Sequence, residues 1–122
     1  MERKEVRHER YKFRIAKHVE PVGIEGEYYI ELKLENPGEM KVKNLLITDV
    51  IPSSSSITEF ISSKAVTHEI VRSFDKSELI IKMSDFNSGS SIIINYYLTG
   101  SDGYPKTEPI VNILDIDEKF PS

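Results

Sequence analysis

The sequence contains no cysteine and no tryptophan, and only two of its 122 residues are alanine. The absence of cysteine excludes a disulfide framework, a thiolate zinc site and a cysteine nucleophile. Apolar runs never approach the length of about 18 residues that a transmembrane helix needs, so we expect no membrane span in this chain. Cationic residues are in the minority, and a formal net charge of −4 argues against a protein that binds nucleic acid by neutralising phosphates. The length fits one domain.

The aliphatic residues that are present favour strands. The chain has 16 isoleucines and 8 valines, against 7 leucines and 2 alanines. Isoleucine and valine are stiff at χ1 and suit a pleated sheet, whereas alanine and leucine favour helices. This balance predicts an all-β chain.

Apolar and polar residues alternate along most of the chain with the period of two that half-buried strands show. The clearest segments are 28–35 and 89–99, and turn residues such as Asn36-Pro37-Gly38 separate them from the next strand. Turns recur at intervals of about 8–12 residues, which is typical of a sandwich or barrel of seven or eight strands. The other expected strands are 11–20, 44–51, 57–61, 66–74, 79–83 and 110–116.

The two ends of the chain differ in composition from the part between them. Residues 1–10 form a charged leader, which we expect to be disordered or the end of a helix. The β-sandwich domain is expected at 11–116, and residues 117–122 are expected to be a flexible tail.

Short motifs between Lys17 and Leu98 resemble the DUF11-like conserved repeat domain of archaeal and bacterial surface proteins. That resemblance implies an immunoglobulin-like antiparallel β-sandwich and a structural or adhesive role, with no catalytic residue to carry over. The chain departs from the family at its four serines after Pro52 and in the extension beyond residue 102. The matching residues are Lys17, Gly26, Tyr28, the segments 35–38 and 45–52, Leu79, and the strand 89–98 that opens at a glycine.

The motif residues also have physical roles of their own. Asn36 and Gly38 suit a tight turn, with Gly38 at a left-handed position. Asp49 is expected to accept N–H groups from the loop that follows Pro52. Pro52 is expected to end its strand.

The residues that usually carry chemistry show no catalytic or ligating pattern. The histidines, at 8, 18 and 68, lack the spacing of metal ligands, and neither a Gly-x-Ser-x-Gly elbow nor a glycine-rich phosphate loop is present. Ser101-Asp102-Gly103 and the pair Asp115/Asp117 lack the oxygen series of a calcium loop and are assigned to a turn and the tail. The sequence therefore predicts no enzyme, no catalytic residue, no cofactor and no metal site.

One group of outward-facing residues is a candidate interaction patch: Tyr29, Ile93 and Tyr97. Exposed aromatic side chains can mark a partner surface, but β-propensity alone also explains tyrosine in a strand. Both readings stay open at the level of sequence.

Three functions follow from these observations. The first is a non-catalytic module of a larger protein, acting in structural, adhesive or assembly contacts at the cell envelope; the absence of any Asn-x-Ser/Thr sequon counts against it. The second is an intracellular protein–protein interaction domain joined to a charged helical segment, and its localisation would be cytoplasmic. In both, a protein partner or self-association is expected. The third is a carbohydrate-binding sandwich, and carbohydrate is disfavoured as a partner because no tryptophan is available to stack on a sugar.

Overall fold

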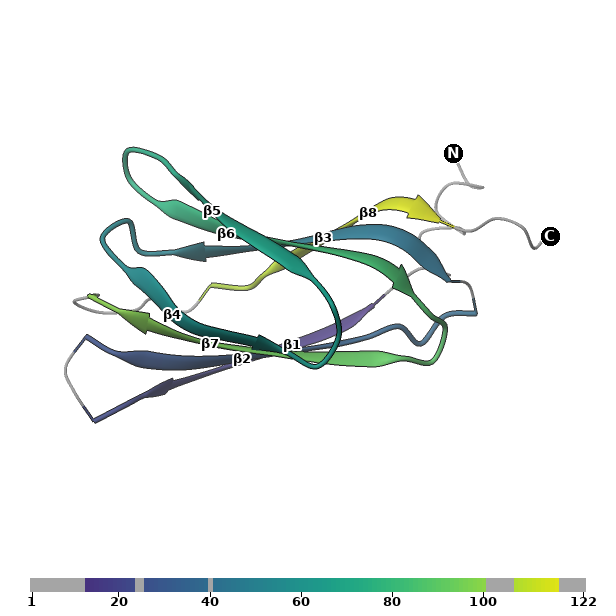
Figure 1. Ribbon diagram of the computed structural model, residues 1–122, viewed down its shortest axis with the longest axis horizontal. Helices are drawn as coiled ribbons and strands as arrows, with labels where there is room; N and C mark the ends of the chain where they lie inside the picture. The colour runs from purple at the N-terminus through teal and green to yellow at the C-terminus, as the bar shows by residue number, and fades with distance from the viewer. Residues whose placement is uncertain (1–12, 24–25, 40, 101–106, 117–122) are drawn as a thin grey trace.

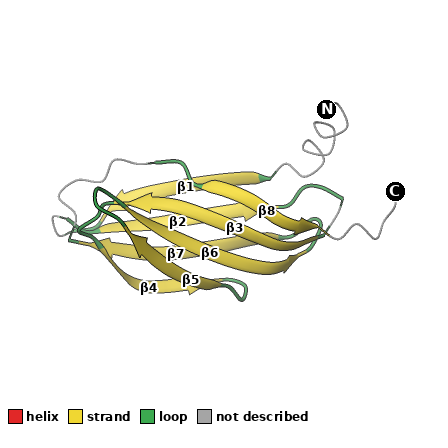
Figure 2. Cartoon of the chain, turned by 90° about the horizontal axis from the view of Figure 1, so that it is seen from above, coloured by secondary structure: helices red, strands yellow, loops and turns green. Residues whose placement is uncertain are grey.

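The computed structural model describes residues 13–23, 26–39, 41–100 and 107–116, whose strands form two sheets packed face to face (Figure 1). Seen from above, the strands of the two layers run in similar directions (Figure 2). No helix occurs among the described residues. The strands are β1 (Arg14–Pro21), β2 (Tyr28–Glu35), β3 (Val42–Ile51), β4 (Ser56–Ser62), β5 (Thr67–Arg72), β6 (Ser77–Phe86), β7 (Ser91–Thr99) and β8 (Ile110–Ile116).

Each sheet has four strands, in the orders β1-β2-β7-β4 and β5-β6-β3-β8, and every neighbouring pair is antiparallel. The predicted all-β, immunoglobulin-like antiparallel sandwich is therefore confirmed. Within that class, β2 lies beside the seventh strand, whereas constant-type immunoglobulin domains place the second strand beside the fifth. Only β1–β2 and β5–β6 are successive strands paired in one sheet, so most connections cross between layers.

The strand predictions hold for every segment, with differences at the ends. The last strand matches its predicted range, and β2 also begins and ends where the alternation does. The strand expected at 79–83 is longer, because β6 continues to Phe86 along the full length of β3. The predicted leader and tail lie outside the described residues.

The core consists of the inward faces of both sheets, as the alternation predicts. In β2 and β7 each second residue is buried, and their neighbours face away from the opposite sheet. The buried apolar side chains are Ile30, Leu32, Leu34, Val42, Leu45, Ile47, Ile51, Leu79, Ile81, Met83, Phe86, Ile92, Ile94, Tyr96 and Leu98.

A polar cluster lies inside this apolar core and joins the two sheets. Lys17 of β1 donates from Nζ to Asp49 Oδ1 of β3 at 2.8 Å, and the Tyr96 hydroxyl of β7 donates to Asp49 Oδ2. Lys17 Nζ also donates to the Thr107 carbonyl at 2.9 Å, just before β8.

The predicted role of Asp49 is therefore wrong. Its carboxylate points into the core toward a lysine, and Ser55 closes the loop after Pro52 through bonds to the Pro52 carbonyl.

Asn36 fastens the end of β2 to the turn between β6 and β7. Its Nδ2 donates to the carbonyls of Phe86 and Asn87, both at 3.2 Å, and its Oδ1 accepts from Gly38 N–H at 3.1 Å. The predicted tight turn is present, but the left-handed residue is Gly89, with φ of 75°, and not Gly38. Gly89 donates its N–H to the Asn36 carbonyl. The residue with positive φ therefore lies in the β6–β7 turn, and not in the turn that follows β2.

We expect Asn36→Ala to lower the free energy of unfolding by about 1–3 kcal/mol, because buried carbonyls lose their donor. Urea unfolding followed by circular dichroism measures the change. The matched control is Asn87→Ala in the β6–β7 turn that Asn36 contacts, where the side chain is exposed and the change should stay within about 0.5 kcal/mol. Equal unfolding midpoints for Asn36→Ala and the native chain would contradict the role assigned to this amide.

Candidate functional site

The outer face of the β1-β2-β7-β4 sheet carries two neighbouring tyrosines. Tyr29 of β2 and Tyr97 of β7 are direct partners in the antiparallel register, and both are half-buried. Their ring centroids lie 5.1 Å apart, with the ring planes tilted by 53°. They face outward because the alternate residues, Ile30 and Tyr96, point into the core.

Asn95 holds the Tyr29 ring in place. It lies two residues before Tyr97 on the same face of β7, and its Oδ1 accepts the Tyr29 hydroxyl at 2.9 Å. Burial, followed by the negative charge of Glu31, raises the pKa of the Tyr29 hydroxyl above its usual value. Because a raised pKa keeps a phenol protonated, this donor is retained at neutral and mildly alkaline pH.

Polar side chains flank the tyrosine pair across the sheet. Glu20 of β1 lies opposite Tyr29, and Thr58 of β4 lies opposite Tyr97, so one row crosses all four strands. Beside Asn95, Ile61 of β4 is 59% exposed. The face therefore has aromatic and aliphatic groups over its central strands and hydrogen-bonding groups beside them.

A bulge in β4 shapes the edge of this face. The register between β4 and β7 shifts between Thr58 and Ile61, and Glu59 has a positive φ of 53°. Because of this bulge, Thr58 and Ile61 are both on the outer face although they are three positions apart in the sequence, an odd spacing that would place them on opposite faces of a regular strand.

The structure brings the three predicted patch residues onto one face. Tyr29 and Tyr97 are in direct ring contact, whereas Ile93 lies opposite Lys33 and is separated from Tyr97 by Asn95. The patch predicted from the sequence did not include Asn95 and Ile61. The alternation places Asn95 on the outer face, but its bond to Tyr29 depends on β2 and β7 being neighbours.

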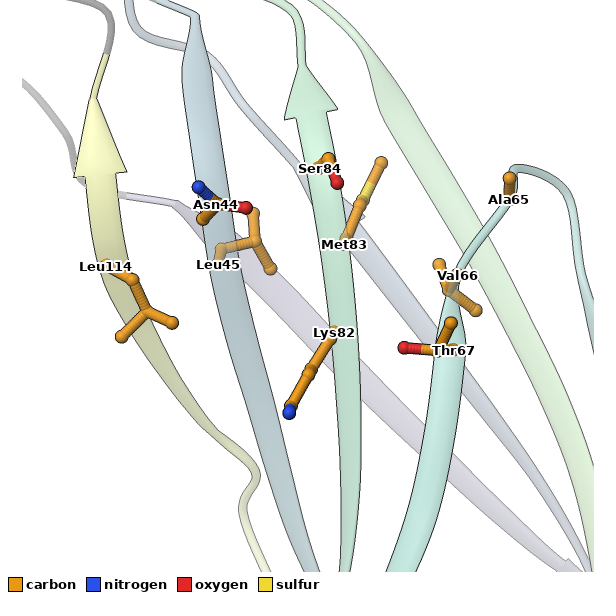
Figure 3. A pocket seen from close by; sticks show the side chains of 9 residues that line it. All are labelled: Asn44, Leu45, Ala65, Val66, Thr67, Lys82, Met83, Ser84 and Leu114. Carbon is orange, nitrogen blue, oxygen red and sulfur yellow. The ribbon is translucent and has the colours of Figure 1, made fainter.

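A shallow hollow lies on the other sheet, between β6 and the segment entering β5 (Figure 3). Its lining combines buried Leu45 and Met83 with the polar ends of Lys82, Ser84 and Thr67. Lys82 is the one titratable side chain among the lining residues. The hollow therefore offers a single cation and no acid–base pair for catalysis.

The histidines with described positions lie apart from one another. His18 approaches Glu20 on the outer face of β1, with 3.8 Å between Nε2 and Oε1. His68 stacks on Phe60 with ring centroids 3.8 Å apart, which links β5 to β4. Within the described part of the chain, no group of three or more His, Cys, Asp or Glu side chains is arranged to hold a metal ion. Asp102 and Asp117, weighed above for calcium, lie outside the described residues.

A search of the described residues for long apolar helices finds none that could cross a membrane.

No family model and no curated protein sequence matches the chain. Solved structures that share its fold include the following two. One is a CBM3 of Hungateiclostridium clariflavum, 15% identical, with a TM-score of 0.55 over 84% of this chain and 93% of that one. The other is the chitin-binding domain of a hyperthermophilic chitinase from Pyrococcus furiosus, 11% identical, with a TM-score of 0.54 over 86% of this chain and 91% of that one. These likenesses show the fold: the chain is a β-sandwich module.

The expectation that disfavoured carbohydrate as a partner is contradicted by these neighbours, of which one is a CBM3 and one a chitin-binding domain. That expectation gave too much weight to the missing tryptophan. Tyrosine also presents an apolar ring face together with a polar group, and this sheet holds two such rings side by side. The DUF11 resemblance remains a prediction, because no family model supports it.

Proposed function

We propose that the chain is a non-catalytic binding module that holds a carbohydrate chain on the outer face of the β1-β2-β7-β4 sheet. The observation that carries the proposal is the Tyr29–Tyr97 pair, fixed in register and tied by the Tyr29–Asn95 bond. Sugar rings expose C–H faces that stack on aromatic rings, while their hydroxyls need hydrogen-bond partners. The sandwich fold shared with a CBM3 and a chitin-binding domain supports this function.

The shape of the face favours a single polymer chain over a crystalline surface. The two rings are tilted by 53°, so both cannot lie flat against one plane. A flexible chain can instead turn between them and place successive sugars on each ring. Glu20 and Thr58, at the two ends of the tyrosine row, are then positioned to bond its hydroxyls.

We expect Tyr97→Ala to weaken binding to a soluble polysaccharide by at least about tenfold, because a ring contact of about 1.4 kcal/mol or more is lost. Titration calorimetry against a panel of soluble glucans, mannans and chitin oligomers measures the change. The matched control is Phe74→Ala, which removes a 98% exposed aromatic ring from the β5–β6 turn and should leave binding unchanged.

The binding proposal fails if no soluble polysaccharide in the panel is bound, or if Tyr97→Ala binds as tightly as the native chain. Binding to crystalline cellulose or chitin with no binding to soluble chains would contradict the single-chain form of the proposal.

A second function, structural or adhesive assembly, is favoured by the outer face of the other sheet. Ile110 and Leu114 of β8 are 58% and 61% exposed, and Val71 of β5 is 42% exposed. Apolar groups on an open sheet can contact a protein partner or another copy of the chain. Both the cell-envelope setting that the DUF11 resemblance implies and the intracellular alternative are compatible with such a contact.

If this face mediates self-association, Leu114→Lys should lower the weight-average mass of the native chain in light scattering toward the monomer value, because a charge would then be buried in the contact. The control is Lys33→Gln on the opposite face, which should leave the mass unchanged. A native chain that is monomeric over the whole accessible concentration range would contradict self-association through β8.

A further inference from the structure

The polar cluster in the core places an amine against a carboxyl group. Lys17 Nζ and Asp49 Oδ1 are 2.8 Å apart, and both side chains have no exposed surface. The residues are 32 positions apart in sequence and belong to opposite sheets, β1 and β3. Lysine is almost never fully buried unless it is paired, so this contact is a specific feature of the fold.

The surroundings of the pair are apolar. Around Lys17 and Asp49 the inward faces of both sheets supply isoleucine, leucine and aromatic side chains. Separate charges are expensive in such a medium. In the reaction proposed below, transfer of one proton from Lys17 Nζ to Asp49 Oδ1 would remove both charges and leave a free amine beside a carboxylic acid. A free amine is a nucleophile, and the carboxyl carbon is the electrophile next to it.

Two further groups complete the arrangement. The Tyr96 hydroxyl donates to Asp49 Oδ2, the oxygen that does not contact Lys17. The Thr107 carbonyl accepts from Lys17 Nζ at 2.9 Å and so helps fix the direction of the amine. Groups held in this way react as if at very high concentration, because the entropy of bringing them together has already been lost on folding.

We propose that Lys17 and Asp49 condense to an intramolecular isopeptide bond. Lys17 Nζ attacks Asp49 Cγ, the Nζ–Cγ bond forms, and the bond from Cγ to Oδ2 breaks. Oδ2 leaves as water, taking one proton from the Tyr96 hydroxyl and the carboxyl proton passed on from Oδ1, and the proton that the amine loses on attack returns to Tyr96. The products are a secondary amide and one water molecule, so the reaction consumes no oxidant, nucleotide or other co-reactant.

The bond would join the edge strand β1 to the central strand β3 of the opposite sheet. It would close a loop from residue 17 to residue 49 and limit the unfolded chain as a disulfide does. The chain has no cysteine and therefore no disulfide. Unlike a disulfide, an amide cross-link forms without an oxidising compartment.

Intact mass spectrometry of the denatured full chain tests the proposal. We expect the native chain to weigh one water molecule less than its sequence. A tryptic digest should contain residues 15–33, uncut after Lys17, joined to residues 44–64. The variants Lys17→Met and Asp49→Ala should show their full sequence masses, and this readout does not depend on whether they fold.

Tyr96→Phe separates the chemistry from the packing. The ring stays in the core and only the proton donor is lost, so the variant should fold but form the cross-link more slowly or not at all. A fully cross-linked Tyr96→Phe would overturn the role of Tyr96. A native chain of full sequence mass, cut by trypsin after Lys17, would overturn the isopeptide bond itself.

Discussion

Asp49→Ala should destabilise the chain by about 3–5 kcal/mol, the largest effect that we expect from a single polar substitution. Lys17 Nζ would lose its contact with Asp49 while remaining without exposed surface, and the Tyr96 hydroxyl would lose its acceptor. Domains of this size are stable by only about 5–15 kcal/mol, so this loss would be a large part of the free energy of unfolding. Urea unfolding by circular dichroism measures the loss.

Two controls distinguish the loss of the buried Lys17–Asp49 contact from a general effect of substitution in the sheets. Glu35→Ala removes a partly exposed carboxylate whose Oε1 lies 3.6 Å from Arg14 Nη1, and it should cost no more than about 1 kcal/mol. The double variant Lys17→Met/Asp49→Leu removes both buried polar groups and should regain much of the stability that Asp49→Ala loses. If Asp49→Ala and Glu35→Ala unfold at the same urea concentration, the pair is not a determinant of stability.

The sequence predicts the strands of this fold well because burial alternates in most of them. In β2 and β7 each apolar residue faces the core, so the period of two is visible without any tertiary information. The bulge in β4 could not be predicted. Glu59 adopts a positive φ there, and nothing in the identity of a glutamate signals that conformation.

The candidate sites depend on which strands are neighbours, and the sequence does not state this. Alternation places Tyr29 and Tyr97 on outer faces, but their ring contact exists because β2 pairs with the seventh strand. Lys17 shows the same limit. It lies on the apolar side of its strand in the sequence pattern, and only the stacking of the two sheets brings Asp49 to it.

Phe86 provides the second large expected effect, because it connects several parts of one end of the sandwich. Its side chain has no exposed surface, and its ring lies 5.8 Å from that of Phe13, which precedes β1. Its carbonyl accepts Asn36 Nδ2, and it pairs with Val42 at the start of β3. Loss of this ring should therefore affect more than the strand that carries it.

We expect Phe86→Ala to cost about 3–5 kcal/mol, from lost burial of the ring and from the cavity that remains. Phe86→Leu should cost clearly less because it fills most of that volume, and Phe74→Ala should stay within about 0.5 kcal/mol because that ring is 98% exposed. Urea unfolding ranks the three variants. Native-state hydrogen exchange of Phe86→Leu should show faster exchange in β1 near Phe13 than in β5, because the Phe13 ring contacts Phe86 whereas β5 pairs with β6 only over residues 77–82. Equal exchange changes in both strands would indicate a global loss of stability in place of a local one.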